Sequence, residues 1–169
     1  GGKIRVESRE GTGSVFFFTL PYNAAQEGSK ARMVLQDEGV VNDFTSEIPG
    51  LKILIAEDDE TSELLLDIIA KMMGAFVLKA RTGIEAVEIF RNHAGIDLIL
   101  MDMQLPGLNG YEATRQIRRE SKEVVIIAQT AFGMAGDREK ALDAGCDDYV
   151  TKPVNTLKLI SIIKRHFGK

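Results

Sequence analysis

From residue 51 onward, short apolar runs alternate with amphipathic segments along the chain. Each apolar run has the length of a β-strand, and in the segment that follows it the apolar residues recur at the spacing of one helix face. This alternation is typical of βα units, which build a parallel sheet covered by helices on both faces. We therefore predict an α/β fold, a doubly wound five-stranded parallel sheet of order 2-1-3-4-5. The expected strands cover about 51–56, 75–79, 96–101, 124–129 and 148–151, and the expected helices about 60–73, 82–93, 111–119, 134–144 and 154–167.

The residues before position 51 follow a different pattern. Residues 2–8 and 14–21 have the alternation or apolar content of strands, and the turn sequence Gly11-Thr12-Gly13 separates them, which predicts a β-hairpin. Residues 22–50 are mostly polar and contain few aromatic side chains, as in a linker. We expect three parts, namely a hairpin at 1–21, a linker at 22–50 and an α/β domain at 51–169.

Composition excludes several classes of protein. The formal net charge is -4 with mixed signs, so we expect no direct contact with nucleic acid. No apolar run reaches the roughly 18–20 residues of a membrane span, so we expect no membrane contact by this fragment. Cys146 has no second cysteine to pair with, which favours a reducing, cytoplasmic location. Acidic neighbours make Cys146 a poor nucleophile, and we expect it to be structural.

Several of the expected strands end on a polar side chain that could take part in a site. Because the carboxyl ends of parallel strands share one edge, these side chains should gather there. They are Glu57, Asp58, Asp102, Thr130 and Lys152. Three carboxylates can hold Mg²⁺, and as a cluster of like charges they should raise the pKa of at least one member. We expect the other acids near strand ends to be solvated loop residues; these are Asp97, Asp143, Asp147 and Asp148.

The chemistry of these groups suggests a phosphoryl acceptor site. Asp102 would follow a central buried strand, which holds a nucleophilic carboxylate rigidly and leaves it accessible. Lys152 precedes Pro153 and is therefore biased towards an extended conformation, from which it could reach a phosphoryl oxygen or pair with Asp102. The hydroxyl of Thr130 offers one more donor.

These residues together resemble a response-regulator receiver domain. The resemblance covers about residues 51–169 and rests on residues 53–58, residues 102–110, Thr130-Ala131 and Lys152-Pro153. It implies a flavodoxin-like fold in which Asp102 accepts a phosphoryl group from a phosphohistidine. It also implies that Glu57, Asp58, Asp102 and the backbone carbonyl of Gln104 bind Mg²⁺, while Thr130 and Lys152 hold the phosphoryl oxygens.

The resemblance further implies a conformational switch. Tyr149 matches an aromatic position whose ring turns inward when the hydroxyl at Thr130 moves to the phosphoryl group. The loop at 131–136 would then shift, and the face formed by the fourth helix, fifth strand and fifth helix of the domain would be remodelled. From periodicity alone, Tyr149 would be a half-buried strand residue.

Three positions depart from the usual pattern of the family or bear on its kinetics. Glu57 stands where many members have Asp, and Ser62 stands where receivers in multidomain kinases often have Asn. Gln104 occupies a position that influences the lifetime of the aspartyl phosphate in the family.

The first 21 residues are similar to the closing glycine box and last two strands of a histidine-kinase ATPase domain. Kinase, linker and receiver in this order are the layout of a hybrid histidine kinase, whose membrane anchoring is left open. The parent would be a phosphotransferase, whereas this fragment would only accept and hydrolyse its own aspartyl phosphate. The expected donor is the phosphohistidine of its own kinase or of a histidine phosphotransfer protein. Neither His93 nor His166 has the sequence context of a phosphoacceptor histidine. A dimer could form through the hairpin or through the face of the fourth helix, fifth strand and fifth helix of the domain.

Three alternative functions remain. A phosphohydrolase with an aspartate nucleophile usually needs a second Asp two residues later, where this chain has Gln104. A nucleotide-binding switch needs a phosphate loop after the first strand, which the sequence lacks. A receiver-like docking module without phosphoryl turnover is the strongest rival, although such a module has no need to keep all five polar residues.

Overall fold

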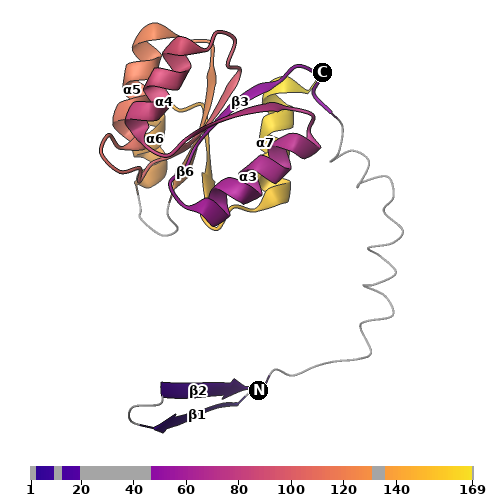
Figure 1. Cartoon of the computed structure of the whole chain (residues 1–169), viewed down its shortest axis with the longest axis vertical. Helices are drawn as coiled ribbons and strands as arrows, with labels where there is room; N and C mark the ends of the chain where they lie inside the picture. The colour runs from indigo at the N-terminus through magenta and orange to yellow at the C-terminus, as the bar shows by residue number, and fades with distance from the viewer. Residues whose placement is uncertain (1–2, 10–12, 20–46, 131–135, 169) are drawn as a thin grey trace. The chain divides into compact units, whose positions relative to one another are not determined.

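The computed structural model describes residues 3–9, 13–19, 47–130 and 136–168 of the chain (Figure 1). The chain forms two compact units, Gly1–Val41 and Asn42–Lys169. Within the described residues, none of the helices combines the length and the apolar character that crossing a membrane requires.

The first unit contains the predicted hairpin. Strands β1 (Ile4–Arg9) and β2 (Gly13–Phe18) pair in antiparallel fashion, with Val6 opposite Phe16. The Arg5 guanidinium lies 4.7 Å from the centre of the Phe17 ring, and both Val6 and Phe17 are exposed. The predicted linker at 22–50 lies mostly outside the described residues.

The second unit has the predicted doubly wound architecture. Its five strands are parallel and lie in the order β4-β3-β5-β6-β7, which confirms the predicted order 2-1-3-4-5 (Figure 1). The strands are β3 (Lys52–Ala56), β4 (Phe76–Ala80), β5 (Leu98–Asp102), β6 (Val125–Thr130) and β7 (Asp148–Thr151). The helices are α3 (Glu60–Met72), α4 (Gly83–Asn92), α5 (Gly110–Glu120), α6 (Asp137–Ala144) and α7 (Thr156–Phe167).

The sheet separates two apolar clusters, because successive strand side chains point to opposite faces. Helices α3 and α7 cover one face (Figure 1). Ile53, Leu66 and Leu159 are among the side chains buried there. Helices α4, α5 and α6 cover the other face, where Leu54, Ile117 and others are buried. The central strand β5 is buried along its whole length, so whatever follows it is rigidly held.

Two local details differ from the sequence-based expectation or extend it. Helix α6 begins at Asp137 rather than at Met134, because Gly136 has φ 105°, a left-handed conformation that cannot continue an α-helix. Met134 itself lies outside the described residues. Ile48, which falls within the predicted linker, packs against the cluster under α3, and its amide donates to the Met73 carbonyl at 3.0 Å.

Candidate functional site

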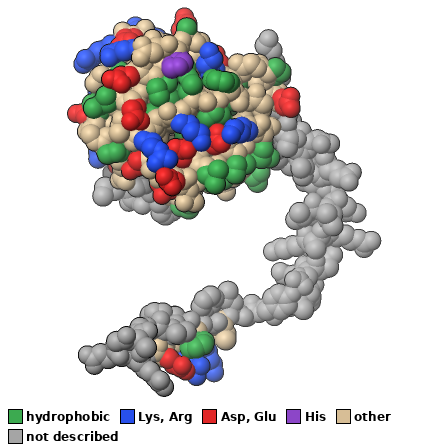
Figure 2. Space-filling model, in the orientation of Figure 1, with side chains coloured by type: hydrophobic (Ala, Val, Ile, Leu, Met, Phe, Trp, Pro, Cys, Tyr) green, Lys and Arg blue, Asp and Glu red, His purple; other side chains and the backbone are tan. Residues whose placement is uncertain are grey.

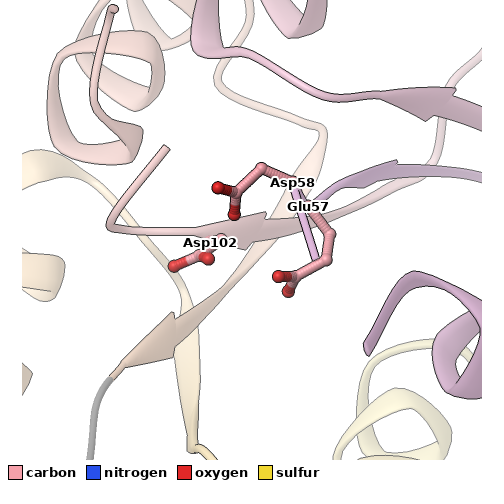
Figure 3. Close-up of side chains that lie close together, drawn as sticks. All are labelled: Glu57, Asp58 and Asp102. Atoms are coloured by element: carbon pink, nitrogen blue, oxygen red, sulfur yellow. The ribbon is translucent and has the colours of Figure 1, made fainter. Parts of the chain in front are cut away.

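Three carboxylates meet at the carboxyl edge of the sheet, as predicted. Glu57 and Asp58 follow β3 directly, and Asp102 is the last residue of β5. These strands are neighbours, with Ala56 opposite Met101, so their ends lie together. One oxygen from each carboxylate lies within 4.8 Å of the others (Figure 3). Glu57 and Asp102 are buried whereas Asp58 is exposed, so the cluster is open to solvent on one side.

Lys152 bridges two of these carboxylates. Its ammonium donates to Glu57 Oε1 at 2.7 Å and to Asp102 Oδ2 at 2.6 Å. Burial by itself would lower the pKa of Lys152, but the hydrogen bonds and charges of Asp102 and Glu57 together raise the pKa. The predicted pairing with Asp102 is therefore present, and Glu57 is a second partner that the sequence reasoning missed. The sequence signal for this contact was that the side chain of Glu57 is longer than that of the Asp found in many members of the family.

Glu57 is a buried acid with unused acceptor capacity. Its side chain is completely buried, and its Oε2 atom has no hydrogen-bond partner among the residues that the structure describes. Burial raises the pKa of Glu57, and the charge of Asp102 raises it further, while Lys152 opposes both effects. An unpaired buried oxygen beside two more carboxylates is a donor set that suits a hard divalent cation such as Mg²⁺.

Asp102 is held through both of its carboxylate oxygens. Oδ2 accepts from Lys152, and Oδ1 accepts from the backbone amide of Gln104 at 2.8 Å. The next amide, that of Met103, donates to the carbonyl of Gln129 on β6 at 3.1 Å. The carboxylate therefore has a fixed orientation, and the backbone of Gln104 turns close beside it.

Thr130 ends β6, opposite Thr151 on β7 and one position beyond the pair Asp102–Gln129. Its hydroxyl is buried and donates to the carbonyl of Val150 at 3.4 Å. Residues 131–135 lie outside the described part of the chain, and with them most of the loop predicted to shift.

Tyr149 is half-buried on β7, which agrees with the reading from periodicity. Two cations lie near its ring: Arg138 on α6 is 5.5 Å and Lys158 on α7 is 5.3 Å from the ring centre. The switching role of Tyr149 remains a prediction.

The acids outside the cluster have structural roles. Asp59 caps α3, where it accepts from the Ser62 amide at 2.8 Å, and this hydrogen bond lowers the pKa of Asp59. The expectation of solvated loop acids is wrong for Asp97, which is only half-exposed, whereas Asp147 is an exposed loop residue as expected but has a structural contact as well. Each accepts a hydrogen bond from a backbone amide of a neighbouring strand, Lys52 at 2.8 Å and Ile126 at 2.7 Å respectively.

The remaining acids, the cysteine and His93 lie outside the carboxylate cluster. Asp143 is exposed, as expected, whereas Asp148 pairs with Arg165. Cys146 is buried, and burial raises the pKa of its thiol to about 11, which agrees with a structural role. His93 lies at the end of α4, with Nδ1 3.0 Å from the Ile89 carbonyl.

Comparisons with known proteins agree with this geometry. Residues 53–164 match the sequence model of the response regulator receiver domain. The chain is similar to the polar-differentiation response regulator DivK of Brucella ovis, with 36% identity over 118 residues that cover 69% of this chain and 95% of that protein.

Two solved structures are similar in both fold and sequence. One is the receiver domain of the sensor histidine kinase PA1611 from Pseudomonas aeruginosa, which has a magnesium ion coordinated in its active site cleft. It has 38% identity and a TM-score of 0.65, and the match covers 71% of this chain and 99% of that one. The other is the co-crystal structure of the Saccharomyces cerevisiae histidine phosphotransfer signaling protein Ypd1 and the receiver domain of Ssk1. Here the identity is 36% and the TM-score 0.67, and the match covers 71% of this chain and 90% of that one. The family match, the doubly wound sheet and the shared sequence agree, and this chain belongs to the response regulator receiver domain family.

Proposed function

We propose that this receiver domain takes a phosphoryl group from a phosphohistidine onto Asp102 in an Mg²⁺-dependent reaction. The observation that carries the proposal is the contact between Lys152 and Asp102 at 2.6 Å beside two further carboxylates. A purely structural domain gains little from gathering three acids, because their mutual repulsion destabilises the fold.

Each group at the site would have a separate role in phosphoryl transfer. Glu57, Asp58, Asp102 and the carbonyl of Gln104 would hold Mg²⁺, which supplies neutralising charge to the transferring phosphoryl group. An oxygen of Asp102 attacks phosphorus in line, so that an O–P bond forms while the N–P bond of the donor breaks and the imidazole leaves. Lys152 turns from Asp102 to a phosphoryl oxygen, and Thr130 donates to another.

The surface of α3 supports a protein as the donor. Leu64, Ile68 and Met72 lie at a spacing of four residues along α3, and their exposed fractions are 56%, 48% and 50%. The charges beside this stripe are already paired, Lys71 with Asp67 and Lys79 with Glu63. On the face of this unit that Figure 2 shows, basic and acidic side chains lie next to one another, with hydrophobic side chains among them. Because the stripe is apolar and α3 starts beside the carboxylates, it fits a protein partner better than a small phosphodonor.

The N-terminal unit supports the larger context. The hairpin of β1 and β2 has the two strands expected for the end of a histidine-kinase ATPase domain. We therefore propose that the chain is part of a hybrid histidine kinase, with the donor histidine on the same protein or on a histidine phosphotransfer protein. Phosphorylation would then act on the face of α6, β7 and α7, where Arg138 and Lys158 both lie near the ring of Tyr149.

The test is phosphorylation with acetyl phosphate and Mg²⁺, followed by intact mass spectrometry. Wild type and the control Asp143→Asn should each gain one phosphoryl adduct, because Asp143 is exposed and outside the cluster. Asp102→Asn should gain none, and EDTA should prevent the labelling of wild type and of Asp143→Asn. Equal labelling of Asp102→Asn would refute the assignment. A wild type that stays unlabelled but still binds a phosphotransfer protein would be a docking module instead.

A further inference from the structure

We infer that Gly110 is a positioning residue for Asp102, acting through the backbone on which the carboxylate is mounted. Gly110 is the first residue of α5 and is buried. A Cβ atom at Gly110 would lie 2.1 Å from the carbonyl oxygen of Asp102 and 2.8 Å from the Cα atom of Met103. Side chains do not approach backbone atoms this closely, so a glycine is needed here because of space.

Conformational freedom is not the reason for this glycine. Gly110 is not among the glycines of positive φ in the part of the chain that the structure describes. Its amide donates to the Met103 carbonyl at 3.3 Å, which holds the start of α5 against the turn after β5. The contact therefore joins a helix directly to the peptide between Asp102 and Met103.

Neither side of this contact can easily give way. Strand β5 is paired with β3 and β6, and the Met103 amide donates to the Gln129 carbonyl on its far side. Helix α5 is anchored by Ala113 and Ile117, which are both fully buried. A methyl group at Gly110 would therefore displace the Asp102–Met103 peptide, and the Asp102 carboxylate would move relative to its partners.

Small displacements matter at such a site. Functional groups have to be held to within about 0.5 Å, and a shift of about 1 Å can cost on the order of 100-fold in rate. Changes in the residues that support metal ligands typically cost about 10–100-fold in metal affinity. The part of the inference that concerns phosphorylation rests on the proposed function, whereas the part that concerns metal binding does not need phosphoryl transfer.

The chain offers a matched control in Gly83. It is the buried first residue of α4, and a Cβ there would lie 2.0 Å from the carbonyl oxygen of Leu108. The clash is as severe as at Gly110, but it falls on a half-buried loop residue rather than on the backbone of Asp102. Both substitutions also raise helix propensity by the same amount, since each replaces glycine with alanine.

The experiment compares Gly110→Ala and Gly83→Ala with wild type in two measurements. Mg²⁺ affinity is measured by calorimetric or NMR titration, and the rate of labelling is measured with acetyl phosphate at saturating Mg²⁺. We expect Gly110→Ala to bind Mg²⁺ about tenfold more weakly and to be labelled about 10–100-fold more slowly. Gly83→Ala should stay within about twofold of wild type in both measurements, since its clash leaves Asp102 in place.

Urea unfolding of each variant shows whether a weaker signal comes from unfolded protein or from displacement of the Asp102 carboxylate in folded protein. If Gly110→Ala is partly unfolded, all three proteins are measured in sucrose, which favours the compact state. The inference is overturned if Gly110→Ala equals wild type, if both variants lose Mg²⁺ affinity alike, or if the loss matches the unfolded fraction. If wild type is not labelled at all, the proposed function fails while the Mg²⁺ titration still decides the role of Gly110.

Discussion

Replacing Lys152 with methionine tests how the site keeps its charges balanced. The change removes the ammonium that bridges Glu57 and Asp102 and leaves two buried carboxylates whose oxygens are within 4.8 Å. At an effective dielectric constant of about 20, two unit charges at that separation repel by roughly 3–4 kcal/mol. Removal of one partner from a buried ion pair typically costs about 3–5 kcal/mol, which is the same range.

Protonation of Glu57 limits this cost. The pKa of Glu57 is already raised by burial, and loss of Lys152 removes a group that lowers it. The deficit of Lys152→Met should therefore be largest at high pH and shrink as the pH falls through the pKa of Glu57 in the folded protein. We expect a loss of about 3 kcal/mol in the free energy of unfolding at neutral pH in EDTA.

The assay is urea unfolding at several pH values, in EDTA and in Mg²⁺. Binding of Mg²⁺ to the native state should recover part of the loss, because a bound cation again neutralises the carboxylates. The control is Lys140→Met, whose side chain is 64% exposed and whose ammonium lies 3.6 Å from Oδ1 of Asp137, three residues earlier on α6. An exposed pair of this kind contributes about 1 kcal/mol at most. The reasoning is refuted if Lys152→Met is as stable as the control, or if its deficit is independent of pH.

Three further predictions concern residues outside the carboxylate cluster. The cap formed by Asp59 stabilises α3 above the ordinary carboxyl pKa of 3.8, and this contribution should be lost as the pH falls through the lowered pKa of Asp59. Asp59→Asn should keep the cap on Ser62 without that pH dependence, whereas Asp59→Ala should lose the cap at every pH, as measured by thermal unfolding. Cys146 should react slowly with a thiol reagent at pH 8 and rapidly after urea is added, because its pKa is about 11 and it is buried. Fast labelling in the native state would contradict this. Arg118→Lys should lose about 2 kcal/mol of stability, since one ammonium cannot replace the bonds from the guanidinium to two backbone carbonyls and Asp147. Its rate of labelling by acetyl phosphate should be unchanged, and a large decrease would mean that this contact reaches the site.

The sheet and the residues at its edge could be predicted because they depend on local patterns. Apolar runs identify strands, and in a parallel sheet every strand that ends on a polar side chain delivers it to the same edge. The pattern therefore predicts that Glu57, Asp58, Asp102 and Lys152 lie together, as they do in the structure.

The contacts that escaped prediction depend on groups that a sequence pattern does not identify. Asp97 and Asp147 accept from backbone amides, which every residue carries, so nothing in the sequence singled out their partners. The start of α6 depends on the φ angle of Gly136. The second partner of Lys152 lies 95 residues away in the chain, and only the distance between two loops decides that it is within reach.

The two apolar clusters on opposite faces of the sheet affect how the sequence of this domain can evolve. Buried side chains of β3 and β5 belong alternately to one cluster or the other, so the faces share strands but no packing partners. Substitutions in contact with different sets of neighbours usually have additive effects on stability. The surface of α3 and α7 and the surface of α4, α5 and α6 can therefore accumulate substitutions independently. A receiver built in this way can evolve a binding surface for a new partner on one face while the side-chain packing under the other face stays unchanged.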